Sequence, residues 1–177
     1  MNFETYGPYF CGDTMITKEH AKDLRHRLEG GEYGTILSSA PGCYVFGVKS
    51  SGSSRVIPWY VGKAERQPAV KEALNDSHLQ VYNEIFHRFK RGSAALFFLP
   101  AITNQGRPTK LAPSGGNKPA IDFLEDWLIA VCLKTNPDLW NIKKTAILRD
   151  MYVRGVFNPR QGDLNSHAAE FKATLGL

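Results

Sequence analysis

The sequence predicts an α+β fold in which helices flank a small, mostly antiparallel sheet of three strands. Two aromatic and β-branched segments lie close together with a short polar loop between them, which is the pattern of a β-hairpin. A third strand-like segment follows only after a helical region. Because a hairpin pairs its strands antiparallel, it argues against a purely parallel sheet.

The length of 177 residues suits one domain with its own core. Hydrophobic residues make up 42% of the chain, the share of an ordinary globular protein, which argues against wholesale disorder. We therefore expect a single domain over residues 1–177.

The first half of the chain supplies one helix and the hairpin. Apolar residues recur at helical spacing over Thr17–Leu28, and two glycines end this helix. The strands are expected at Cys43–Val48 and at Ile57–Val61, with the loop Ser50–Ser54 between them. Gly62 is expected to end the second strand.

The second half alternates helices with one buried strand and a long loop. The strand is rich in apolar and aromatic residues, and the loop in Gly, Pro and polar residues, which is typical of functional loops. The expected elements are helices at Pro68–Leu74 and Leu79–Lys90, the strand Ala94–Ile102, the loop Thr103–Pro119, and helices at Ala120–Lys134 and Ser166–Leu175.

The charge of the chain is unevenly distributed. Its 22 Lys and Arg exceed its 17 Asp and Glu, for a formal net charge of +5, and residues 85–119 contain no acid. Such a stretch creates a positive field that attracts phosphate, unless it is simply a solvated surface with a mobile loop. The positive residues there are Arg88, Lys90, Arg91, Arg107, Lys110 and Lys118.

Several classes of protein do not fit the sequence. Its three cysteines, Cys11, Cys43 and Cys132, form neither a disulfide framework nor a CxxC metal motif, which favours a reducing compartment. Neither a membrane-spanning run nor a secretory signal is visible. The Walker, HExxH, GxSxG and GxGxxG motifs are absent. We expect a cytoplasmic protein without membrane contact.

Glu125 is unusual for its helix. Its neighbours on the same helical face are Ile121, Leu128, Ile129 and Cys132. A carboxylate among apolar side chains is costly to bury unless it meets a cation, a metal or strong donors. The alternative is a peripheral Glu that reaches water or pairs with Lys or Arg.

Four short motifs occur in order along the chain, and together they resemble the GIY-YIG nuclease family. The two name-giving tripeptides appear as Gly42-Cys43-Tyr44 and Tyr60-Val61-Gly62. A helical acid follows at Glu125, and an asparagine after a proline at Asn141. The resemblance covers residues 42–143, which leaves residues 1–41 and 144–177 as extensions packed on a nuclease-like domain.

This resemblance implies a metal-dependent endonuclease with DNA as the expected nucleic acid. Glu125 would hold one Mg²⁺ or Mn²⁺ ion, largely through oxygen ligands and retained waters. Tyr44 would take a proton from the attacking water, directly or through a neighbour, and Tyr60 would orient water or phosphate. Asn141 would fix the geometry through hydrogen bonds. Nucleic-acid contacts are expected from Lys63, Arg88, Lys90, Arg91, Arg107 and Lys110.

The chain departs from the family at an arginine that usually follows the second tripeptide, because Val70 stands there. We expect Arg66 or His78 to supply the missing cation; the pair His87-Arg88 and Lys63 are the other candidates. The departure also leaves open a relative that binds nucleic acid without cutting it. A third possibility is an interaction protein whose basic loop meets an acidic partner.

Overall fold

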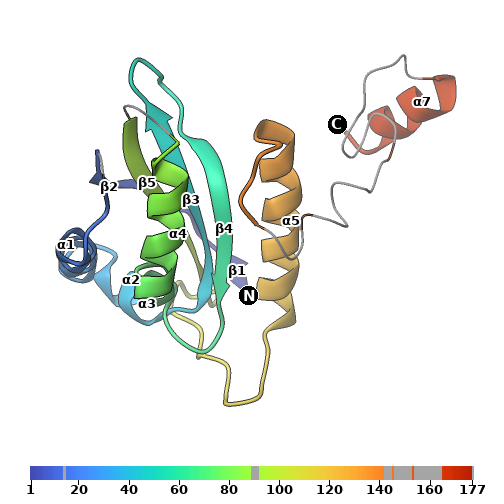
Figure 1. The fold of residues 1–177 in the computed structure, drawn as a ribbon. Coiled ribbons are helices and arrows are strands. Elements are labelled where there is room, and N and C mark those ends of the chain that lie inside the picture. The colour runs from blue at the N-terminus through green and yellow to red at the C-terminus, as the bar shows by residue number, and fades with distance from the viewer. Residues whose placement is uncertain (14, 89–91, 142–144, 146–152, 154–164, 177) are drawn as a thin grey trace.

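The computed structural model describes residues 1–13, 15–88, 92–141, 145, 153 and 165–176 (Figure 1). Its strands are β1 (Asn2–Phe3), β2 (Tyr6–Gly12), β3 (Gly42–Ser50), β4 (Ile57–Ala64) and β5 (Gly92–Ile102). The helices in these ranges are α1 (Lys18–Glu29), α2 (Gly34–Ser39), α3 (Ala69–Ala73), α4 (Asp76–Phe86), α5 (Pro119–Thr135) and α7 (Ser166–Thr174).

The sheet is antiparallel, as expected, but it has five strands among the described residues where three were predicted. The two additional strands, β1 and β2, come from the segment taken as an N-terminal extension. They pair one after the other along the edge of β5, while β3 lies on the other side of β5 and β4 forms the far edge. The sequence did not predict β2 because the strand contains Gly7 and Pro8. Both residue types are rare in strands, although an edge strand tolerates them.

Most of the predicted elements are confirmed, with small shifts at their ends. Strand β4 runs through Gly62 to Ala64, so the prediction that Gly62 ends it was wrong. Helix α4 begins at Asp76 because the Asn75 side chain caps it by accepting from the His78 amide. The short helix α2 was not predicted.

Helices cover both faces of the sheet (Figure 1). Helices α1 to α4 lie on one face, where Phe46, Leu96 and Phe98 join the main hydrophobic core. Helix α5 covers the other face and packs on Val61 and Cys43 in two smaller clusters. Successive residues of a strand point to opposite faces, so each strand contributes to both layers.

The outer edge of β4 is covered by the chain that follows α5. The Asn136 side chain donates to the Pro58 carbonyl at 2.8 Å, and the Trp140 amide donates to the Trp59 carbonyl at 2.8 Å. The Asn141 side chain then accepts from the Val61 amide at 2.9 Å and donates to the Val61 carbonyl at 2.6 Å. These bonds satisfy backbone groups that an edge strand otherwise presents to solvent.

None of the helices in the described ranges is both long and apolar enough to cross a lipid bilayer.

Candidate active site at the edge of strand β4

Both tyrosines of the tripeptide motifs meet one histidine. The Tyr44 hydroxyl lies 2.9 Å from Nε2 of His78, and the Tyr60 hydroxyl lies 3.4 Å from the same atom. Tyr44 comes from β3, Tyr60 from β4 and His78 from the first turn of α4. The structure therefore brings three predicted site residues into one cluster on the helix α4 side of the sheet.

Gly62 is what allows Tyr44 to reach this position. It pairs with Tyr44 across the hairpin, and a Cβ atom on Gly62 would overlap the Cζ and hydroxyl oxygen of Tyr44. The Tyr44 ring thus lies across the backbone of β4, and its hydroxyl is carried toward the outer edge of the sheet. A side chain at position 62 would occupy the space that the ring uses.

We expect Gly62→Ala to destabilise the protein by about 1–3 kcal/mol, because the added methyl forces the Tyr44 ring out of its site. Urea denaturation followed by circular dichroism measures the loss. The cost should largely disappear in a Tyr44→Ala background, where no ring opposes the methyl. An equal cost in both backgrounds would show that the strain lies in the backbone instead.

The other nitrogen of His78 faces acceptors. Nδ1 lies 2.9 Å from Oδ1 of Asn75 and 3.8 Å from Oε1 of Glu72. Since both partners are oxygens that accept, the hydrogen-bond network assigns the ring proton to Nδ1. Nε2 is then the acceptor for the Tyr44 hydroxyl.

Burial sets the protonation of this cluster. It lowers the pKa of His78 below its usual 6.5, against a smaller opposite effect of Glu72. Burial also raises the pKa of Tyr44 well above 10, with added contributions from Tyr82, Tyr60, Glu72 and Glu125. Burial also raises the pKa of Tyr60, and the charges of Glu125 and Glu72 raise it further. At neutral pH the phenols are protonated donors and the imidazole is neutral.

Glu125 lies in a second group, centred on the ammonium of Lys63. Nζ of Lys63 is hydrogen-bonded to Asp122 and lies 3.5 Å from Glu65 and 3.9 Å from Glu125. Burial lowers the pKa of Lys63, but the hydrogen bond to Asp122 and the charges of Glu125 and Glu65 outweigh it, so the pKa is raised. Lys63 is therefore a permanent cation among three carboxylates.

The two groups lie on opposite faces of the sheet. Glu125 stands on α5, which covers the face opposite to that of the tyrosines. Its charge nevertheless raises the pKa of both phenols, so it lies within electrostatic range of them. Tyr60 and Lys63 come from the same strand, and the groups therefore approach each other at the β4 edge.

Asn141 acts on the backbone of β4. Both polar atoms of its side chain bond to Val61, between Tyr60 and Gly62. The sequence predicted that this residue fixes geometry through hydrogen bonds, and the structure gives it partners suited to that task. It holds the strand from which Tyr60 and Lys63 extend.

The remaining predicted residues are spread over the surface. Arg66 is exposed, and its guanidinium points to the Gly116 carbonyl at 3.4 Å, not to the tyrosines. Arg88 stacks 4.3 Å above the Trp140 ring, beside the segment that covers β4. Arg107 and Lys110 are exposed on the loop after β5. Lys90 and Arg91 lie outside the described residues.

Sequence reasoning missed the partners that complete each group. Asp122 was not singled out from the sequence, although it lies three residues before Glu125 and therefore neighbours it on the helix surface. Glu65 comes directly after β4, and its closeness to Lys63 in the sequence was the only local sign of their contact. Asn75 meets His78 as the N-cap of α4, which is a local pattern, whereas Glu72 lies near His78 because α3 packs beside α4.

The donor chemistry of the second group fits a hard divalent cation. Three carboxylates around one ammonium leave an excess of negative charge, and carboxylate oxygens are the ligands that Mg²⁺ prefers. Among the residues that the structure describes, no three acid, His or Cys side chains are arranged as a ready-made metal cage. A single carboxylate such as that of Glu125 would leave most positions around such an ion to water.

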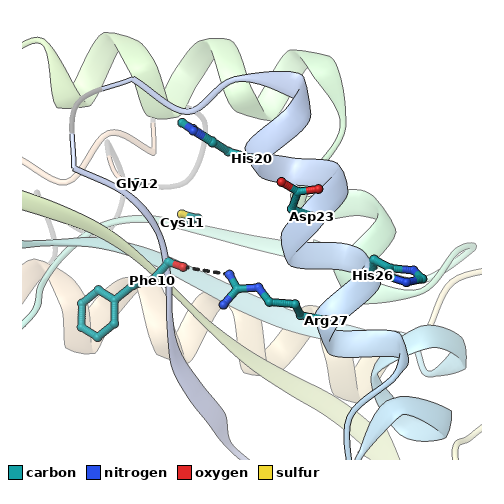
Figure 2. A pocket seen from close by; sticks show the side chains of 7 residues that line it. All are labelled: Phe10, Cys11, Gly12, His20, Asp23, His26 and Arg27. Carbon is teal, nitrogen blue, oxygen red and sulfur yellow. Dashed lines mark hydrogen bonds between the residues drawn. The ribbon is translucent and has the colours of Figure 1, made fainter.

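A separate cavity of about 520 Å³ lies between β2 and α1, toward the sheet edge opposite β4 (Figure 2). His20, Asp23 and Arg27 of α1 line it, and the Arg27 guanidinium donates to the Phe10 carbonyl at 3.4 Å. Burial raises the pKa of the Cys11 thiol there to about 12, so this thiol is not a nucleophile at neutral pH. The cavity lacks the tyrosines and carboxylates of the β4 edge.

Comparison with known proteins adds no identification. No family model matches the chain, and searches of curated proteins and of solved structures each returned no significant match.

Proposed function

We propose that this chain is a divalent-metal-dependent endonuclease of the GIY-YIG type, which hydrolyses phosphodiester bonds of nucleic acid, with DNA as the expected substrate. The observation that supports this most directly is the convergence of the Tyr44 and Tyr60 hydroxyls on Nε2 of His78. This cluster lies beside a carboxylate group at one edge of the sheet. Two phenols and an imidazole on one face, with a hard-ion donor on the other face near the same edge, suit the activation of water against a phosphate.

In this proposal Tyr44 relays a proton. As the attacking water gives its proton to the Tyr44 oxygen, the proton of Tyr44 passes to Nε2 of His78 along the 2.9 Å hydrogen bond. The imidazolium that forms is stabilised by Glu72 beside Nδ1. The relay does not require Tyr44 to be deprotonated before the reaction, which agrees with the raised pKa of its hydroxyl. Tyr60 donates a hydrogen bond that orients the water or the phosphate.

Glu125 would hold Mg²⁺ or Mn²⁺, with Asp122 and Glu65 adding negative potential around it. When bound, such an ion supplies charge stabilisation for the phosphate and the leaving oxygen. Lys63 brings a fixed positive charge to the same point, and Asn141 keeps β4 in place. In this assignment His78, not Arg66, is the residue beside the tyrosines, and it acts there as a neutral proton acceptor and not as the cation of the family pattern.

A second candidate is a protein that binds nucleic acid without cutting it. It is favoured by the ammonium of Lys63, which already neutralises part of the carboxylate charge. Within the described ranges no guanidinium is hydrogen-bonded to Tyr44 or Tyr60, so the charge that the family pattern places there is lacking. Binding without hydrolysis under every metal condition would establish this alternative.

The deciding experiment is a cleavage assay with the full chain. Supercoiled plasmid, linear duplex, single-stranded DNA and single-stranded RNA are incubated with Mg²⁺, with Mn²⁺ or with EDTA, and products are resolved on gels. We expect nicked or linear DNA with either ion and none with EDTA. Intact substrate under all conditions would contradict the nuclease.

The rate of cleavage should depend on the protonation of His78. Because the relay requires a neutral imidazole, the rate is expected to fall with decreasing pH through an apparent pKa below 6.5, and to level off near neutrality. The folded pKa is lower than the unfolded one, so the stability linked to the neutral ring is present above pH 6.5 and is lost as the pH falls below it.

Two measurements check this dependence. A pH–rate profile of the wild type should show the acidic limb, and any residual activity of His78→Gln should lack it. Urea denaturation at several pH values should show that the stability of the wild type falls more between pH 6.5 and 5 than that of His78→Gln. Identical profiles for the two proteins would remove His78 from the relay.

A further inference from the structure

An open groove of about 610 Å³ lies where β4 ends and α3 begins. Lys63, Glu65 and Glu72, which belong to the candidate active site, form part of its lining. The rest of the lining includes Arg66, Gln67 and Lys71. The groove therefore leads from the proposed site of cleavage along the molecular surface.

The outer cations of this groove face solvent. Lys71 is exposed on α3, and Arg66 is exposed on the turn before it. Both nitrogens of Arg66 that reach the Gly116 carbonyl do so at 3.4 Å, longer than a well-formed hydrogen bond. The guanidinium can exchange this weak contact for a phosphate, which is its preferred bidentate partner.

The two acidic residues that line the groove, Glu65 and Glu72, bind donors of the protein itself. Glu65 accepts from the backbone amide of Lys118 and lies 3.5 Å from the Lys63 ammonium. Glu72 is hydrogen-bonded to Gln67 and accepts from Asn75 at 3.4 Å. The carboxylates of Glu65 and Glu72 are thus hydrogen-bonded or ion-paired to residues of the groove itself. The positive charges of Arg66 and Lys71 face solvent at the opening of the groove.

We propose that this groove binds the backbone phosphates of the nucleic-acid strand next to the scissile bond, and that Arg66 and Lys71 make the contacts. The inference rests on the proposed function for its ligand and adds the path of the strand and two residues that hold it. Contacts of this kind recognise the backbone and not the bases. Binding through them is independent of sequence and weakens with salt.

Fluorescence anisotropy with a labelled DNA duplex of mixed sequence tests the groove, in EDTA so that no cleavage occurs. For the double variant Arg66→Ala/Lys71→Ala we expect binding about tenfold weaker or more, and a slope of log affinity against log salt lower by about two. The charge-conserving variant Arg66→Lys/Lys71→Arg should keep the wild-type slope.

The matched control is Lys22→Ala/Arg27→Ala, which removes the same charge from exposed positions of α1, on the β2 side of the sheet. It should bind as the wild type does. Loss of binding equal to that of the groove variant would overturn the proposal, since only net charge would then matter. Unchanged binding by the groove variant, or absence of salt-dependent binding by the wild type, would overturn it as well.

The outcomes separate the groove from the nuclease. A wild type that binds with the expected slope but cuts nothing refutes the nuclease and keeps the groove, provided that the groove variant binds weakly. A wild type that cuts DNA, together with a groove variant that binds and cuts equally well, refutes the groove and keeps the nuclease.

Discussion

Replacement of Tyr44 by phenylalanine is expected to lower the rate of DNA cleavage by about 10²–10⁴-fold, the usual contribution of a positioned acid or base. The ring still fills the space over Gly62, so the packing of the hairpin is retained. Only the hydroxyl that is hydrogen-bonded to Nε2 of His78 is lost. Single-turnover cleavage measures the chemical step, and urea denaturation should show a loss of about 1 kcal/mol for the missing hydrogen bond.

Tyr82 offers a matched control for this variant. Its hydroxyl is also buried beside the cluster, and within the described structure it has no hydrogen-bond partner. Its ring stacks on Phe46 with centroids 4.2 Å apart, a contact that phenylalanine keeps. Tyr82→Phe should therefore cleave DNA at about the wild-type rate and be equally or more stable, because a buried hydroxyl without a partner is costly. Equal rate losses in both variants would indicate a general disturbance of the core and not proton transfer.

The exchange of Glu125 for glutamine is expected to reduce metal-dependent cleavage by about 10³-fold, since ion stabilisation of a transition state is worth several kcal/mol. Glutamine keeps the size of the side chain but removes the charge that attracts the ion. Calorimetric titration with Mn²⁺ gives a second readout, in which the variant should bind the ion far more weakly than the wild type. Circular dichroism should show the same fold.

The control for this exchange is Asp126→Asn, which removes one carboxylate from the next position of α5. Because the proposal gives Asp126 no part in holding the ion, Mn²⁺ binding and cleavage should stay near wild-type values. If Glu125→Gln binds Mn²⁺ as the wild type does, Glu125 is only a counter-ion of Lys63. The metal would then have to be held elsewhere.

Much of the fold follows from local patterns. The alternating aromatic and β-branched residues of β3 and β4 predicted a hairpin, and the apolar spacing of α5 predicted a long helix there. Strand β2 escaped notice because a strand at the sheet edge tolerates Gly and Pro and need not be continuously apolar. Its position is fixed by pairing with β5, some 85 residues away, and no local sequence encodes that pairing.

The sequence predicted which residues belong to the candidate site better than it predicted how they are arranged in space. Tyr44, Tyr60 and Glu125 were recognised from motif order, and His78 was one of the two preferred candidates for the missing cation. The structure places His78 beside the tyrosines because α4 begins next to the hairpin, but burial lowers the pKa of the imidazole, so the ring is neutral near pH 7 and does not supply that cation. That Glu125 approaches from the other face of the sheet depends on where α5 packs, and this follows from long-range contacts with Val61 and Cys43.

The hydrogen bonds that run from Asn136 to Asn141 along β4 also bear on whether two copies of the chain can pair through their sheets. An uncovered β4 would offer its amides and carbonyls to the strand of another molecule, which is a common route to aggregation. The same bonds hold the strand that carries Tyr60 and Lys63. A chain shortened before Asn136 would therefore lose its protection against self-association at the same time as its alignment of reactive groups.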